Sequence, residues 1–178
     1  SALTRKILVM TEKENISIAE EVKTLKLYLD IEKARFEENF NYEINISENI
    51  DSENTKIPSM LLQVYIENAL KHGLLHKKGL KNLEIKFSEN QENILIEIID
   101  NGIGREKSAA LNAIKNKNHT SFATRAMKNR IDLLNSNKKE KMKIEIIDVY
   151  NQKDQSSGTK VSIKIPINDS EDIGDNSF

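Results

Sequence analysis

The sequence predicts an α/β fold, a two-layer sandwich in which a mixed, mostly antiparallel sheet carries its helices on one face. Three observations support this prediction. Apolar residues recur with helical spacing in some segments and alternate with polar residues, as strands do, in others. Short polar turns join neighbouring strands, which favours antiparallel pairing. The helical segments are apolar along one side, so they are expected to pack on a shared sheet face.

Composition limits both the domain count and the partners. The chain has 178 residues, 27 basic and 28 acidic side chains, a net charge of −1 and no cysteine. A length near the ~150 residues of a typical domain predicts a single domain. The near-zero net charge argues against a nucleic-acid partner, and the missing cysteines exclude disulfides and thiolate metal sites. No apolar run approaches the roughly 18–20 residues that cross a membrane.

The first helix and the first strand have clear signals. Apolar residues recur at three- and four-residue steps over residues 17–36, and Ser17 followed by Glu20 forms a capping box at the start. Alternation over residues 40–46 then predicts a half-buried strand, which is followed by a polar loop over 47–55.

A second helix is predicted over residues 59–73. Pro58 can open its first turn, and Gly73 is a natural C-cap. This segment is apolar on most of its sides, so we expect it to be sandwiched in the core.

Two strands follow, over residues 83–87 and 94–99, and the turn at 88–93 makes them a hairpin. The second strand is the denser apolar run, as expected of a central strand. It stops at the strong turn signal Asp100-Asn101-Gly102.

The last third of the chain begins with a polar segment, residues 105–120, which is long for a connector and is therefore a candidate mobile lid. An amphipathic helix is predicted over 121–135, with Phe122, Ala126, Met127, Ile131 and Leu134 on its apolar face.

Two closing strands are predicted over residues 141–150 and 159–167, joined by a polar turn at 151–158. The acidic, polar end at 168–178 predicts disorder.

One candidate site lies on the second helix. Asn68, Lys71 and His72 are three and four residues apart, so they share a face. The amide oxygen of Asn68 suits Mg²⁺, and the ammonium group of Lys71 suits a phosphate. The alternative is an ordinary helix end, in which both basic side chains favour the helix dipole.

A second candidate is Asp100-Asn101-Gly102-Ile103-Gly104. A carboxylate at the end of a central strand can accept a hydrogen bond from an exocyclic amine, and the two glycines let the backbone approach a flat ring. The alternative is a common tight turn. A third segment, Gly158-Thr159, is on its own only a turn. The sequence contains no phosphate-binding loop of the G-x-x-x-x-G-K-[ST] type and no nucleophile elbow.

Taken together, these segments resemble the ATP-binding domain shared by gyrase, heat-shock chaperone, histidine kinase and MutL ATPases, which has the Bergerat-type fold. The finer resemblance is to sensor histidine kinases of the LytS type. Residues 28–36 resemble that family's Y-L-x-I-E-x-x-R-F helix, and residues 56–63 resemble its K-I-P-x-M-L-L-Q segment. The resemblance covers about residues 16–167.

This resemblance implies ATP and Mg²⁺ as ligands and a role for each matching residue. Asn68 would coordinate Mg²⁺, Lys71 would contact phosphate, and His72 would line the nucleotide. Asp100 would accept from the adenine amino group, with Thr159 supporting the same edge. Gly102 and Gly104 would flank the adenine and act as hinges of the lid. Glu67 is a candidate base or orienting group, so the implied catalytic residues are Glu67 and Asn68.

The sequence departs from the family in two places. The second glycine box is absent, and the hydroxyl groups of Ser121 and Thr124 are candidate substitutes in binding phosphate, with Arg125 and Arg130 as phosphate or helix-packing residues. The family's phosphoacceptor histidine box is also missing. Residues 1–15 are expected to be a remnant of the upstream dimerisation and phosphoacceptor helix, so this chain is expected not to phosphorylate itself and to be a monomer, although its full-length protein would be a homodimer.

The resemblance further implies the cytoplasmic domain of a bacterial inner-membrane sensor, with a response regulator as partner. Three alternatives stay open: a nucleotide-binding regulatory module without kinase activity, a non-kinase ATPase, and an interaction domain that has lost nucleotide binding. The ATPases usually carry a carboxylate four residues before the metal-binding asparagine. Here that residue is Val64, which argues against the ATPase alternative.

Overall fold

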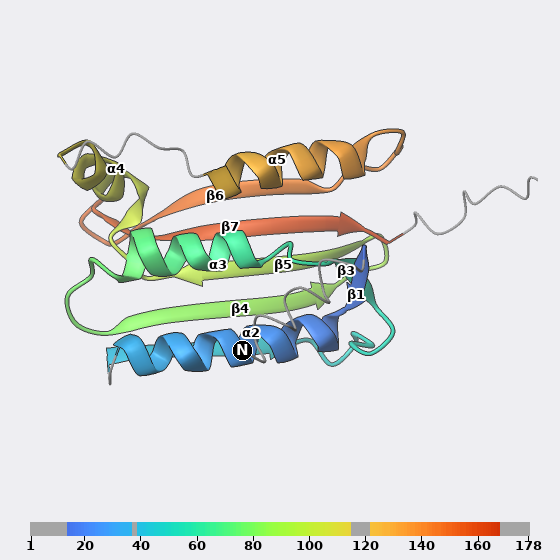
Figure 1. Cartoon of the computed structure of the whole chain (residues 1–178), viewed down its shortest axis with the longest axis horizontal. Helices are drawn as coiled ribbons and strands as arrows, with labels where there is room; N and C mark the ends of the chain where they lie inside the picture. Colours follow the sequence, from blue (N-terminus) through green and yellow to red (C-terminus); the bar gives the residue numbers. More distant parts are fainter. Residues whose placement is uncertain (1–13, 37–38, 115–121, 168–178) are drawn as a thin grey trace, which may run out of the picture.

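The computed structural model describes residues 14–36, 39–114 and 122–167. A five-stranded sheet forms one layer, in the order β2-β4-β5-β7-β6, and Figure 1 shows helices α2, α3 and α5 lying across one of its faces. The strands are β2 (Phe40–Ile46), β4 (Lys81–Glu89), β5 (Asn93–Asp100), β6 (Lys143–Tyr150) and β7 (Ser156–Pro166). The predicted two-layer α/β sandwich is therefore confirmed.

The sheet is mixed and mostly antiparallel, as predicted. β2 and β4 pair in parallel, whereas β4–β5, β5–β7 and β6–β7 are antiparallel. Alternate residues of the central strands are buried beneath the helices, among them Ile85, Phe87, Ile96 and Ile163. The alternating pattern predicted for these strands therefore marks the face of the sheet that the helices cover.

Helix α2 (Ile18–Phe36) begins with the predicted capping box. The Ser17 backbone N–H donates to Glu20 Oε2, and the Glu20 N–H donates to Ser17 Oγ, each at 3.1 Å. A small ribbon that the sequence did not predict precedes the helix: β1 (Asn15–Ser17) pairs with β3 (Lys56–Pro58). Three residues per strand are too few to show alternation. Residues 1–13 of the expected remnant 1–15 lie outside the described residues, and Asn15 belongs to β1. The expected disordered tail, residues 168–178, also lies outside the described residues.

The predicted helix 59–73 begins four residues too early, whereas its predicted end lies one residue before the end of the helical segment at Leu74. Pro58 closes β3, and α3 (Gln63–Asn68) begins only after a turn in which Met60 has a φ of 61°. Gly73 is not a C-cap, since it lies inside the π-helical continuation η2 (Ala69–Leu74) and is buried. A Cβ atom at Gly73 would lie 2.9 Å from Asp100 Oδ1, so the glycine allows close packing against the strand end.

The polar segment predicted as a lid begins with a regular helix, α4 (Gly104–Ile114), and its residues 115–120 lie outside the described residues. The amphipathic helix is confirmed as α5 (Phe122–Asn135). Met127 is buried, while Ile131 and Leu134 are partly buried against the core. Ala126 is exposed, so its predicted place on the apolar face is wrong.

The two closing strands are confirmed as β6 and β7, although β7 begins three residues earlier than predicted, at Ser156. Within the described residues, no helix combines the length and the apolar character that crossing a membrane requires.

Candidate functional site

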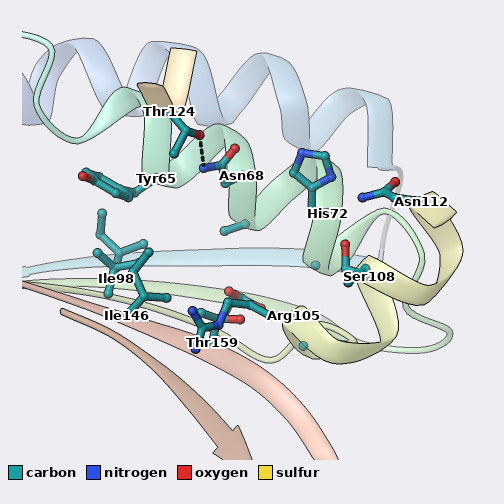
Figure 2. A pocket seen from close by; sticks show the side chains of 16 residues that line it. Tyr65, Asn68, His72, Ile98, Arg105, Ser108, Asn112, Thr124, Ile146 and Thr159 are labelled. Atoms are coloured by element: carbon teal, nitrogen blue, oxygen red, sulfur yellow. Dashed lines mark hydrogen bonds between the residues drawn. The ribbon is translucent and has the colours of Figure 1, made fainter. Parts of the chain in front are cut away.

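A pocket of about 280 Å³ lies between the helical segment α3–η2, helices α4 and α5, and strands β5, β6 and β7. Figure 2 shows Asn68 and Thr124 on one side of it, with Thr159 and Arg105 across from them. Its apolar lining comes mainly from Tyr65, Ala69, Ile98, Ile146 and Val161. The pocket therefore has a largely apolar lining with a few polar groups, which is the usual character of a small-molecule site.

Asp100 is the acidic group of the pocket and is only 5% exposed. The Gly102 backbone N–H donates to its Oδ1 at 2.8 Å, and Thr159, its register partner on β7, provides a second backbone hydrogen bond. Burial raises the pKa of Asp100 to about 6, although these hydrogen bonds and the charge of Lys77 oppose the rise. Asp100 is thus a partly desolvated acceptor at the end of the central strand.

The two glycines of the Asp100–Gly104 segment are used for close packing. A Cβ atom at Gly102 would lie 2.5 Å from the Cα atom of Gly73, and Gly102 itself does not line the pocket. Gly104 does line it; its φ is +79°, and a Cβ atom there would lie 1.7 Å from Ser156 Oγ. A side chain at either position would push η2 or α4 away from the strand ends.

Asn68 reaches the pocket from the last residue of α3. Its amide nitrogen donates to Thr124 Oγ1 at 3.5 Å, and Figure 2 shows its oxygen turned away from that hydroxyl. The described residues contain no group of three or more His, Cys, Asp or Glu side chains that could hold a metal ion. One amide oxygen fits Mg²⁺ that is held chiefly by substrate phosphates and water, as this ion commonly is.

The other polar residues of the predicted helix face differ in their positions. His72 lines the pocket, and burial together with the positive charges of His76 and Lys71 lowers its pKa. Lys71 and Glu67 do not line the pocket. They form an ion pair of 3.2 Å, and Glu67 also accepts from Gln63 at 2.9 Å.

Helix α4, in the segment predicted as a lid, supplies one wall of the pocket, although the sequence predicted neither its helical structure nor its lining residues. Its lining residues, Arg105, Ser108, Ala109 and Asn112, follow helical spacing along one face. Arg105 Nε and Nη2 each bind the carboxylate of Asp148 on β6 at 2.7 Å, so α4 is tied to the edge strand. Small polar side chains in a polar segment give no signal of this wall, since the hydrophobic periodicity that reveals a helix face is weak there.

Of the predicted site residues, the structure brings six together around the pocket: Asn68, His72, Asp100, Gly104, Thr124 and Thr159. Gly102 packs behind the pocket and Ser121 lies outside the described residues. Arg125 is exposed, whereas Arg130 is partly buried and donates to the carbonyl group of Ser59. The polar groups therefore form two clusters, with a carboxylate at the strand ends and an amide and a hydroxyl at the junction of α3 and α5.

Comparison with known proteins identifies relatives for about half of the chain. No family model matches it. It is 29% identical over 98 residues to the sensor histidine kinase/phosphatase LytS of Staphylococcus aureus, which is 54% of this chain and 16% of that protein. It is 32% identical over 89 residues to the sensor protein LytS of Bacillus subtilis, which is 50% of this chain and 15% of that protein. The match thus spans about a sixth of these relatives' length.

Solved structures share the fold. The histidine kinase domain of a blue-light activated histidine kinase from Erythrobacter litoralis matches with a TM-score of 0.59 and 14% identity, over 86% of this chain and 68% of that one. The histidine kinase ThkA in complex with the response regulator protein TrrA matches with a TM-score of 0.54 and 11% identity, over 93% and 46% of the two chains. These comparisons confirm the resemblance predicted from the sequence: the chain has the fold of histidine kinase catalytic domains and resembles a LytS-type ATP-binding domain.

Proposed function

We propose that this chain binds ATP with Mg²⁺ and is the catalytic domain of a sensor histidine kinase. The observation that carries this proposal is the arrangement of two different polar groups in one largely apolar pocket. Asp100 is a buried acceptor at the strand ends, and Asn68 offers an amide oxygen on the facing helix. A purine with an exocyclic amine suits the first group, and a metal-bound phosphate chain suits the second.

The base would lie against Ile98, Ile146 and Val161, with its amino group donating to Asp100. Thr159 lines the same edge and bonds to Asp100, so it would hold the carboxylate in place for the base. An ionised carboxylate only accepts hydrogen bonds, so this end of the pocket would favour adenine over a base that presents a carbonyl oxygen there.

The phosphates would extend toward the junction of α3 and α5. Mg²⁺ bound there would neutralise charge that develops on the transferred phosphoryl group. Asn68 would supply the protein's oxygen to it. Thr124, as the acceptor for the Asn68 amide nitrogen, would keep that oxygen turned toward the ion. Lys71 and the hydroxyl of Ser121 are proposed to contact phosphate when nucleotide is bound.

In the transfer step, a nitrogen lone pair of a histidine would attack the γ-phosphorus. The bond to the β–γ bridging oxygen breaks, ADP leaves, and the proton on the other ring nitrogen passes to a base or to water. Glu67 is the proposed base or orienting group. Its bonds to Gln63 and Lys71 favour the orienting role, because both carboxylate oxygens are already engaged.

The phosphoacceptor histidine, the response regulator and the dimeric, membrane-anchored sensor belong to the proposal for the whole protein. Support comes from the names of the LytS relatives and from the ThkA–TrrA complex among the structures of the same fold. In that protein this domain would face the cytoplasm, where ATP is available.

Transfer to a separately produced phosphoacceptor helix fragment tests the proposal. With γ-labelled ATP and Mg²⁺, the fragment should gain label that is lost when its histidine is replaced. Nucleotide binding without transfer would instead favour the alternative of a regulatory module. The absence of both would leave the interaction-domain alternative.

A further inference from the structure

A cluster of buried and partly buried polar groups lies outside the pocket, around the turn that leads into α3. Glu21 of α2 and Ser59 of this turn are each 2% exposed. The guanidinium group of Arg130 on α5 donates to the Ser59 carbonyl oxygen through Nη1 and to Ser59 Oγ, at 3.5 Å, through Nη2. The Leu62 backbone N–H donates to the Glu21 carboxylate, on which the charge of Arg130 also acts.

The turn between these two attachment points is strained. Met60 has a φ of 61°, a conformation that a non-glycine residue adopts only where the surrounding structure holds it. Leu61 and Leu62 next to it are fully buried. Because Leu62 directly precedes α3, the geometry of this turn sets the direction of the helix.

Helix α3 is six residues long, ends at Asn68 and continues directly as η2. Helix α5 contacts both of its ends, through Arg130 at the preceding turn and through Thr124 at the Asn68 amide. Figure 1 shows α3 and α5 next to each other above the sheet. A small change at the turn would therefore be carried to Asn68, because a short helix moves as a rigid unit.

We propose that Glu21 and Arg130 are positioning residues that hold the turn of residues 59–62, so that α3 presents Asn68 to the pocket. The proposal deepens the proposed function, on which its nucleotide readout rests. Burial raises the pKa of Glu21 to about 7, which shows how much this carboxyl group is desolvated. Burying a carboxyl group costs free energy even when it is hydrogen-bonded, and an apolar side chain of similar size would avoid that cost. Packing alone therefore gives no reason for charged groups here, whereas the alignment of a strained turn does.

The test compares Arg130→Met and Glu21→Gln with a matched control. Leu29→Ala also removes buried contacts of α2, but Leu29 is apolar and takes no part in the cluster. All variants are measured at a temperature at which circular dichroism shows them folded. Arg130→Lys, which keeps the charge but not the paired donors, replaces Arg130→Met if the latter does not fold.

The first readout is backbone hydrogen exchange, which does not depend on nucleotide. In Arg130→Met the amides of residues 63–68 should exchange at least about tenfold faster, while those of β4 and β5 change no more than in Leu29→Ala. Adding Glu21→Gln to Arg130→Met should recover global stability, because a neutral amide then replaces the buried carboxyl group, yet leave α3 exchanging fast. Equal exchange across α3 and the sheet, as a purely structural role predicts, would overturn the proposal.

The second readout is the ratio of the ADP dissociation constants without and with Mg²⁺. It should fall toward one in Arg130→Met and stay at the wild-type value in Leu29→Ala, while adenosine affinity stays within about twofold in both. An unchanged ratio in Arg130→Met would overturn the positioning of Asn68. If the wild-type chain itself shows no Mg²⁺-dependent binding, the proposed function is wrong, and the exchange readout still decides whether the two residues hold the turn.

Discussion

Gly102 packs directly on the backbone of Gly73, so closely that a Cβ atom on Gly102 would lie 2.5 Å from the Gly73 Cα atom. This contact joins the turn after the central strand to the helical segment that follows Asn68. It brings Asp100 and Asn68 into the same pocket, although 31 residues of sequence, 100 − 68 − 1, separate them.

Gly102→Ala should therefore destabilise the protein by about 3 kcal/mol, because the methyl group overlaps backbone that cannot rotate away. Gly79→Ala is the matched control. Gly79, unlike Gly102, has a positive φ, of 80°, but nothing lies within 4 Å of its Cβ position. It should lose only about 1 kcal/mol. Urea unfolding of the two variants measures the difference, and equal losses would contradict the packing role of Gly102.

Asp100→Asn should raise the free energy of unfolding at pH 7 while abolishing nucleotide binding. The amide has the same shape and carries no charge, so the cost of burying a carboxylate disappears. A pKa of about 6, against the ordinary value of 3.8, corresponds to a destabilisation of the folded state by at most about 3 kcal/mol. We therefore expect Asp100→Asn to raise the free energy of unfolding by about 1–3 kcal/mol. Thermal unfolding and an ATP titration of the same sample measure both effects. A variant that is less stable and still binds ATP would contradict the assignment of Asp100.

The pH dependence of adenosine binding should follow the ionisation of Asp100. Only the ionised carboxylate accepts hydrogen bonds from the amino group without carrying a competing O–H donor. The affinity for adenosine should therefore fall about tenfold for each pH unit below about 6 and level off above it. Adenosine is the probe because phosphate groups titrate in the same range.

Folding stability should change in the opposite direction. Between pH 4 and 6 the folded state binds more protons at Asp100 than the unfolded state does, so this residue makes the protein less stable as the pH rises. Titrating the wild-type protein alongside Asp100→Asn isolates the effect. A wild-type curve parallel to that of the variant would show that Asp100 does not titrate in this range.

The ion pair between Arg105 and Asp148 should fix the α4 wall of the pocket. The side chains are 52% and 28% exposed, so their direct contribution to stability is about 0.5–1 kcal/mol and should shrink in high salt. Asp148→Ala should weaken ATP binding about fivefold, or by about 1 kcal/mol, because α4 loses its tie to β6. A double-mutant cycle with Arg105→Ala checks this, and strictly additive effects would mean that the pair does not hold the wall.

Much of the fold could be predicted because its elements have strong local signals. The alternation of apolar and polar residues was sufficient to predict β4, β5 and β7, and the capping box was sufficient to predict where α2 begins. Local patterns failed where tertiary contacts decide the structure. Residues 59–62 look helical, yet Met60 adopts a positive φ in a turn held by distant Arg130.

The same division applies to the candidate site. Asn68 and Asp100 could be predicted because they stand out, as an amide in an apolar helix and as a carboxylate after an apolar strand. Ser108 and Asn112 could not, because small polar side chains in a polar segment look like any solvated surface. The burial of Glu21 was equally hidden, since the groups that accompany it inside come from distant parts of the sequence.

Calorimetric titration of ATP into the wild-type chain and Asp100→Asn, with and without Mg²⁺, is the most direct test of whether this pocket binds ATP. Binding to the wild-type chain should be saturable and strengthened by Mg²⁺, and it should be lost in the variant. No binding at millimolar ATP, or equal binding by the two proteins, would contradict this prediction.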